Sequence, residues 1–203
     1  NDPNAQGFDD WYGFVDQSYA HYYYPERIWK NTKRIEIPEN YGLRKDGHYG
    51  DISQGVFIHD EFTRNAKRFI EENKKTPFFI YLPYTIPHLE FVVPKDSLEQ
   101  YLGTWPEKPG PPFTGKFYDG FGYCATDAPL AIRAAMISRM DRDIGAIMQQ
   151  LKDLGLDNNT LVIFASDNGV LPDKGGNDVE FFDGNGPYRE TKFTYYEGGI
   201  RVP

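Results

Sequence analysis

A carboxylate and an amide stand side by side at Asp167 and Asn168, within the motif Ser166-Asp167-Asn168-Gly169. Their oxygens are the hard ligands that Ca²⁺ and Mg²⁺ prefer in proteins. Gly169 permits a sharp turn that would point both side chains inward. The same residue types also form ordinary turns, so a metal site at this motif depends on where the fold places it.

Two further residues could act on a negatively charged substrate. His88 follows a proline and carries a ring that exchanges protons near neutral pH. Lys192 follows a loop rich in glycine, and its ammonium is a point charge suited to sulfate or phosphate oxygens. A structural histidine and a solvated surface lysine are the alternative interpretations, and the sequence around each residue leaves both open.

The surrounding sequence predicts the elements that position these residues. Continuous apolar runs at residues 78–82 and 160–165 are typical of strands covered on both faces. Residues 60–73 and about 129–154 have the apolar spacing of amphipathic helices, and Asp127 is a candidate N-cap for the second one. A strand, a helical crossover and a second strand form a parallel unit, so the sequence predicts an α/β fold.

The parallel arrangement also predicts where the polar residues lie. The carboxyl ends of parallel strands share one edge of a sheet. His88 follows the first predicted strand, and Asp167 with Asn168 follows the second. We therefore expect these polar side chains, distant in sequence, to meet at that edge.

The composition excludes several classes of function. The chain has 203 residues and a net charge of −8, whereas binding to a nucleic-acid backbone relies on clustered lysine and arginine. Its one cysteine, Cys124, excludes an intrachain disulfide. No apolar run approaches the roughly 20 residues that cross a bilayer, so we expect no membrane span. Both ends of the chain have the character of cut ends, and we expect an internal fragment.

Five blocks of the sequence resemble, in order, those of the sulfatase family, the type I formylglycine-dependent, arylsulfatase-like enzymes of the alkaline phosphatase superfamily. The blocks are residues 7–14, 22–25, 77–88, 166–169 and 192–203. The resemblance covers essentially the whole chain. It implies an alkaline phosphatase-like α/β sandwich, truncated at both ends, with a largely parallel or mixed central sheet and helices on both faces. Residues 1–203 would be an internal segment of a single catalytic domain.

The resemblance also implies a role for each candidate site residue. Asp167 and Asn168 would bind the active-site Ca²⁺, with Mg²⁺ the less favoured cation. His88 would contact the sulfate and the leaving-group oxygen, and Lys192 would neutralise sulfate charge. The family's formylglycine arises from a cysteine in a Cys-x-Pro-Ser-Arg block, which this sequence lacks, so the nucleophile is expected upstream and the fragment is expected to be inactive alone. Cys124 stands outside such a block and is interpreted as an ordinary thiol.

Three other features of the sequence concern the surroundings of the candidate site. Glu90 stands where members of the family often have proline, in Pro-His-x-Pro. His21 is interpreted as a core or surface histidine, and a place in the substrate pocket of the intact enzyme is the less favoured alternative. Residues 94–129 contain many prolines and glycines and predict an ordered irregular stretch.

The expected activity of the intact parent protein is hydrolysis of an organic sulfate ester, aryl or carbohydrate, through formylglycine and Ca²⁺. Its partner would be a sulfated small molecule or a sulfated glycan, with no nucleic acid involved. One alternative is a phosphodiesterase or phosphonate hydrolase of the same superfamily, and another is a non-catalytic carbohydrate- or sulfate-binding module. Similar sulfatases are mostly exported or lysosomal, which favours a periplasmic, extracellular or lysosomal enzyme. The sequence does not determine the oligomeric state.

Overall fold

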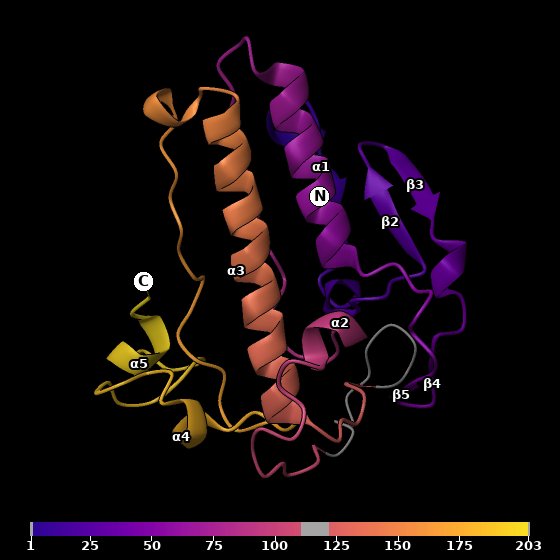
Figure 1. Cartoon of the computed structure of the whole chain (residues 1–203), viewed down its shortest axis with the longest axis vertical. Coiled ribbons are helices and arrows are strands. Elements are labelled where there is room, and N and C mark those ends of the chain that lie inside the picture. The colour runs from indigo at the N-terminus through magenta and orange to yellow at the C-terminus, as the bar shows by residue number, and fades with distance from the viewer. Residues whose placement is uncertain (1, 111–121, 203) are drawn as a thin grey trace.

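Two long helices, lying side by side, dominate the computed structural model, which describes residues 2–110 and 122–202 (Figure 1). Helix α1 comprises Ile58–Asn73 and helix α3 comprises Pro129–Asp153, and both run in the same direction. Both predicted amphipathic helices are therefore confirmed. The short helices are α2 (Lys95–Leu98), α4 (Val179–Phe182) and α5 (Glu197–Ile200).

Helix α3 is capped from a distant part of the chain. The amides of Leu130 and Ala131 donate to the two carboxylate oxygens of Glu107, each at 2.9 Å. The prediction of Asp127 as N-cap is wrong, because a long-range carboxylate satisfies these first-turn donors instead. At the other end, Gly155 takes a left-handed backbone with φ of 69° and stops the helix as expected.

The sheets of the described residues are small and antiparallel. Strands β1 (Tyr12–Gly13), β2 (Arg27–Lys30) and β3 (Lys33–Glu36) form one sheet in that order, and β4 (Arg44–Lys45) pairs with β5 (His48–Tyr49). The predicted parallel sheet is therefore not formed in the described part of the chain. Short 3₁₀ helices comprise Pro3–Gln6, Tyr19–His21, Pro38–Asn40 and Asp157–Asn159.

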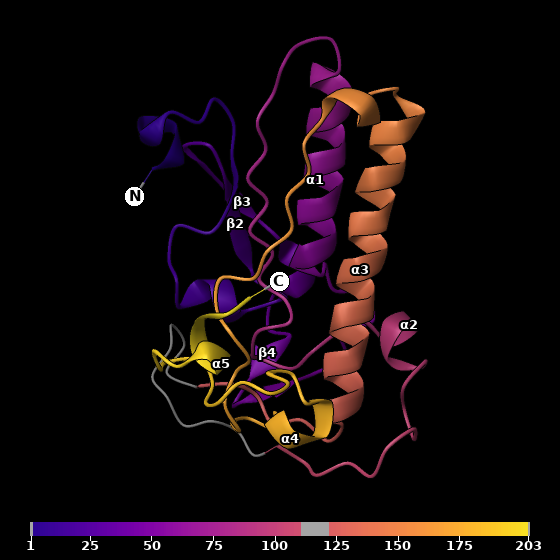
Figure 2. The same ribbon diagram turned by 90° about the vertical axis from the view of Figure 1, so that its left-hand side faces the viewer.

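The two segments predicted as buried strands run back along the helices and do not pair as β-strands with any described residues. Residues 78–82 follow α1, residues 160–165 follow α3, and both descend beside the helices in the same direction (Figure 2). Many of their apolar side chains face solvent, with Phe79 74% exposed and Leu161 86% exposed, whereas Leu82 packs against the core. The direction and order of these segments agree with a parallel unit. The strands themselves are absent because no described strand lies beside either segment to pair with it.

The core lies between α1, α3 and the aromatic N-terminal region. Tyr23, Ile58 and Met136 are fully buried there and come from three different parts of the chain. Residues 111–121 of the predicted irregular stretch lie outside the described residues, and α2 lies within the part that is described. In residues 2–110 and 122–202, no helix has the length and apolar character needed to cross a membrane.

Candidate functional site

His88 lies on a turn that is fixed from beneath by a buried tyrosine. The hydroxyl of Tyr23 is within 3.0 Å of the Thr85 carbonyl oxygen and 2.7 Å of the His88 carbonyl oxygen. The ring Nδ1 of His88 lies 2.7 Å from the Leu89 carbonyl oxygen. Because a carbonyl only accepts, Nδ1 carries the proton, and Nε2 of the neutral ring is the basic nitrogen.

The electrostatic surroundings of His88 link it to the other candidate residues. Burial lowers the pKa of the His88 ring, the charges of Lys192 and His21 lower it further, and the charge of Asp167 opposes them. The net result is a pKa below the ordinary value of 6.5, so the free ring is neutral at pH 7. The charges of Lys192 and Asp167 thus both act on the protonation of His88.

Backbone contacts bring the Asp167 turn and the Lys192 loop together. The amide of Lys192 donates to the Val170 carbonyl at 2.9 Å, and the amide of Gly169 donates to the Gly199 carbonyl at 2.9 Å. A Cβ at position 169 would lie 1.9 Å from the Gly198 carbonyl oxygen. Glycine is therefore required at 169 by close backbone approach, and not by the sharp turn that the sequence suggested.

Asp167 and Asn168 offer oxygen ligands suited to a hard cation, but two ligands are too few to complete its coordination. The side chain of Asp167 is exposed, and the amide nitrogen of Asn168 donates to the Gly169 carbonyl at 3.0 Å, which leaves the amide oxygen available. Ca²⁺ takes six to eight oxygens. Across the described residues, no group of three or more histidine, cysteine, aspartate or glutamate side chains is placed to hold a metal.

Two aromatic rings surround His88 that the sequence did not assign to the site. The centroid of the His21 ring lies 4.9 Å from that of His88, in an edge contact. Tyr123 lies 5.7 Å from the His21 ring and 6.4 Å from the His88 ring. We call His21, His88 and Tyr123 the ring cluster. The one sequence feature that indicates a contact between His21 and His88 is the position of His21 within an aromatic block.

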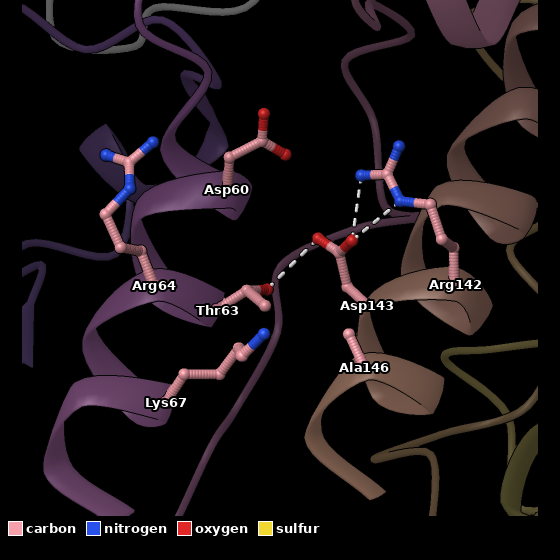
Figure 3. Close-up of a pocket in the computed structure, with 7 residues that line it drawn as sticks. All are labelled: Asp60, Thr63, Arg64, Lys67, Arg142, Asp143 and Ala146. Atoms are coloured by element: carbon pink, nitrogen blue, oxygen red, sulfur yellow. Dashed lines mark hydrogen bonds and ion pairs between the residues drawn. The ribbon is translucent and has the colours of Figure 1, made fainter. Parts of the chain in front are cut away.

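A groove between α1 and α3, with a volume of about 320 Å³, holds another group of charged side chains (Figure 3). Asp143 receives Thr63 Oγ1 at 3.1 Å and Arg142 Nε at 2.9 Å, while Asp60 pairs with Arg139 at 2.6 Å. Lys67 points into the gap between the helices. Since both carboxylates are bound by protein groups, this groove is a structural ion-pair network.

A second cavity, of about 330 Å³, adjoins the Asp167 turn at Gly169. Glycine and other small residues form much of its lining, and its one charged side chain, Arg201, pairs with Glu197 at 2.6 Å. This cavity presents no side chain suited to bond cleavage. The candidate site is thus the edge where His88, the Asp167 turn and the Lys192 loop approach one another.

Comparison with known proteins shows which family the chain belongs to. The family model described as Sulfatase matches residues 1–203, the full length of the chain. The chain belongs to the sulfatase family. An N-acetylgalactosamine-6-O-sulfatase of Bacteroides thetaiotaomicron is 34% identical over 151 residues, which are 72% of this chain and 24% of that protein. Mouse N-acetylgalactosamine-6-sulfatase is 28% identical over 216 residues, covering 99% of this sulfatase chain and 33% of its own length.

Solved structures agree with the family assignment. The crystal structure of Ps i-CgsB in complex with k-i-k-neocarrahexaose superposes with a TM-score of 0.68 at 25% identity, covering 99% of this chain and 40% of that one. The putative sulfatase yidJ from Bacteroides fragilis gives a TM-score of 0.58 at 20% identity and shares the fold. This sulfatase chain therefore spans about a quarter to two fifths of the lengths of the proteins it matches here.

Proposed function

We propose that the parent protein of this chain hydrolyses an organic sulfate ester at the edge formed by His88, the Asp167 turn and Lys192. The observation that supports the proposal is that the charges of Asp167 and Lys192 both act on the His88 ring, while backbone hydrogen bonds join the Asp167 turn to the Lys192 loop. Family membership over all 203 residues supports the sulfate chemistry. A sulfated carbohydrate is the first candidate substrate, because two relatives are N-acetylgalactosamine-6-sulfatases and one of the two similar structures is a complex with k-i-k-neocarrahexaose.

The side chains of this chain fit the charge that sulfate ester cleavage develops. Negative charge grows on the sulfate oxygens and the departing oxygen, and a preorganised Lys192 ammonium stabilises it. A bound sulfate beside His88 favours the protonated ring and raises its pKa from the lowered value of the free site. We propose that Nε2 faces the leaving-group oxygen. The proton that Nε2 takes up is then donated to this oxygen as it departs.

Asp167 and Asn168 would hold Ca²⁺, which when bound would neutralise sulfate oxygens and polarise the sulfur centre. Two oxygen ligands fall short of a full calcium shell, so we propose that the other ligands come from parts of the parent protein outside this chain. The formylglycine nucleophile is assigned there as well, because no Cys-x-Pro-Ser-Arg block occurs in residues 1–203.

We also propose that residues 1–203 form an internal segment of one catalytic domain. The matched relatives are about three to four times longer than the segment they share with this chain. Residues 78–82 and 160–165 expose apolar side chains and lack ladder partners among the described residues. Strands from the rest of the parent would pair with them and build the parallel sheet that the sequence indicates.

The test measures the full-length parent on matched sulfate and phosphate esters, including 6-sulfated N-acetylgalactosamine and an aryl sulfate. We expect sulfate hydrolysis that falls about 10²- to 10³-fold in kcat in Lys192→Ala, as for removal of one transition-state donor. The control Lys152→Ala removes an exposed lysine near the end of α3 and should leave turnover unchanged. Preferential hydrolysis of phosphate esters would favour the phosphohydrolase alternative, and glycan binding without turnover or Ca²⁺ dependence would favour the binding module.

A further inference from the structure

A buried ion pair lies next to the candidate site and has no part in the proposed chemistry. Arg44 Nε lies 3.2 Å from Glu90 Oε1, and the two side chains are only 7% and 1% exposed. Glu90 also accepts hydrogen bonds from the Tyr49 hydroxyl and from the Cys124 amide, the latter at 2.8 Å. Burying two charges is costly unless each is fully paired and hydrogen-bonded, and here Glu90 has three donors around it.

The contacts of this pair reach the chain beside every member of the ring cluster. Glu90 is two residues beyond His88, and its carboxylate holds the amide of Cys124, the residue after Tyr123. Arg44 donates to the carbonyl of the residue before Tyr123 and lies over the ring of Tyr22, the residue after His21, at 4.4 Å. One ion pair therefore contacts residues next to His21 and Tyr123 in the chain, and its Glu90 is two positions from His88.

The Arg44 guanidinium also keeps its charge, and the Tyr49 hydroxyl keeps its proton, over a wide range of pH. Burial lowers the pKa of the Arg44 guanidinium, but the carboxylate of Glu90 outweighs burial and the net pKa is raised. Burial and the same carboxylate raise the pKa of Tyr49 well above its ordinary value, so this hydroxyl stays protonated and donating. A pair locked in this way suits a rigid support.

We propose that Arg44 and Glu90 are positioning residues for sulfate ester hydrolysis, which fix the ring cluster without touching the substrate. The inference rests on the proposed function, because positioning His88 affects the rate only if His88 acts on a sulfate ester. Misplacement of a catalytic group by about 1 Å can cost about 10²-fold in rate. Loss of the pair would shift the His88 turn and the chain around Tyr123 together, and so would act on kcat more than on KM.

The test uses Glu90→Gln in the full-length parent, which keeps the shape of the side chain and removes its charge. We expect kcat to fall about 10- to 100-fold with a smaller change in KM. Tyr49→Phe removes one donor to Glu90 without leaving a buried charge unpaired, and should lower kcat about 2- to 10-fold. It keeps the proposal testable where Glu90→Gln does not fold.

The matched control is Asp60→Asn, which breaks another ion pair with a buried arginine, Arg139 with Asp60. It should reduce stability and leave kcat per folded molecule unchanged. The second readout is the ring ¹H–¹⁵N spectrum of His88 and His21, which should change in the Glu90 and Tyr49 variants and stay constant in the control.

Each result decides one of the two claims. A wild-type protein without activity on any sulfate ester contradicts the proposed function, while the ring spectra still test the positioning of the cluster. An active wild type whose Glu90→Gln and Tyr49→Phe variants match it in kcat and in the His88 spectrum overturns the positioning role alone. Equal losses of kcat in Asp60→Asn and Glu90→Gln would also overturn it, because the effect would then be general.

Discussion

The region packed around α1 and α3 and the region of residues 160–202 are built in different ways. The first has a continuous apolar core and largely buried ion pairs such as Arg44 with Glu90. The second is held by backbone hydrogen bonds and glycine contacts, and its aromatic side chains face solvent, with Tyr195 97% exposed. The packed region carries His88, while the exposed region carries Asp167, Asn168 and Lys192.

This difference separates two requirements of the candidate site. A packed environment fixes the ring of His88 before a substrate arrives, which is the basis of electrostatic preorganisation. The metal and sulfate groups depend on loops that pack only lightly on the rest of the chain. We therefore expect most mutations in the packed region to act on stability, with those at the Arg44–Glu90 pair acting on kcat as well. Mutations in the exposed region should act on the site with a smaller effect on stability.

The largest expected effect on stability comes from Met136→Ala. This side chain is fully buried between the helices and the aromatic core, and its loss leaves a cavity. The free energy of unfolding should fall by about 2–5 kcal/mol, measured by urea denaturation of the parent protein. Met148→Ala, on the exposed side of the same helix, is the control and should change it by less than about 0.5 kcal/mol. Equal effects would contradict the placement of the core.

The next effect is pH-dependent and involves Asp143. Burial raises its pKa, but the His59 ring, whose Nε2 lies 3.3 Å from the carboxylate, and a hydrogen bond from Arg142 outweigh burial and bring the pKa to about 2, from an ordinary 3.8. A carboxylate with a lowered folded pKa stabilises the fold above the unfolded value and loses that contribution as the pH falls toward the folded value. Asp143→Asn should thus cost about 1.5–3 kcal/mol near pH 6.

That difference between Asp143→Asn and the wild type should shrink as the pH falls from about 4 to about 2. Denaturation curves across this range, with the carboxyl pKa measured by NMR, provide the check. A difference that stays constant down to pH 2 would show that the charge of Asp143 is not the stabilising feature.

Gly169→Ala is expected to reduce stability less than Met136→Ala does, and to reduce function more. The added Cβ would collide with the Gly198 carbonyl oxygen and separate the Asp167 turn from the chain that follows Lys192. Overpacking of this kind costs about 1–3 kcal/mol, and hydrogen exchange should accelerate at the Lys192 amide. Gly145→Ala, on α3 with open space around it, should be neutral or stabilising. Unchanged exchange at Lys192 in Gly169→Ala would contradict the contact.

Local pattern predicted the helices well and the strands poorly. The spacing of apolar residues placed α1 and α3 within two residues at either end, because one apolar stripe on each helix packs within this chain. The runs at 78–82 and 160–165 have strand composition, yet a strand also needs a neighbour, and the described residues provide none. Helical hydrogen bonds are local whereas ladder hydrogen bonds are not, which explains the contrast.

The sequence singles out candidate site residues, whose role stays a prediction, but it does not reveal the residues that support them. His88, Asp167 and Lys192 stood out by residue type and by family blocks, and the structure brings them within electrostatic range. The contacts of His21 and the Arg44–Glu90 pair depend on long-range packing that no spacing rule shows. In the sequence, Glu90 stands out only as a departure from a proline pattern, although it is buried at the centre of a hydrogen-bonded cluster.

The central claim is that His88, the Asp167–Asn168 pair and Lys192 serve one catalytic edge. The most direct test is a crystal structure of the full-length parent with Ca²⁺ and a sulfated substrate analogue. The account predicts a calcium ion on the oxygens of Asp167 and Asn168, and a sulfate group contacted by His88 Nε2 and Lys192 Nζ. A sulfate bound elsewhere, with these side chains facing away from it, would contradict the account.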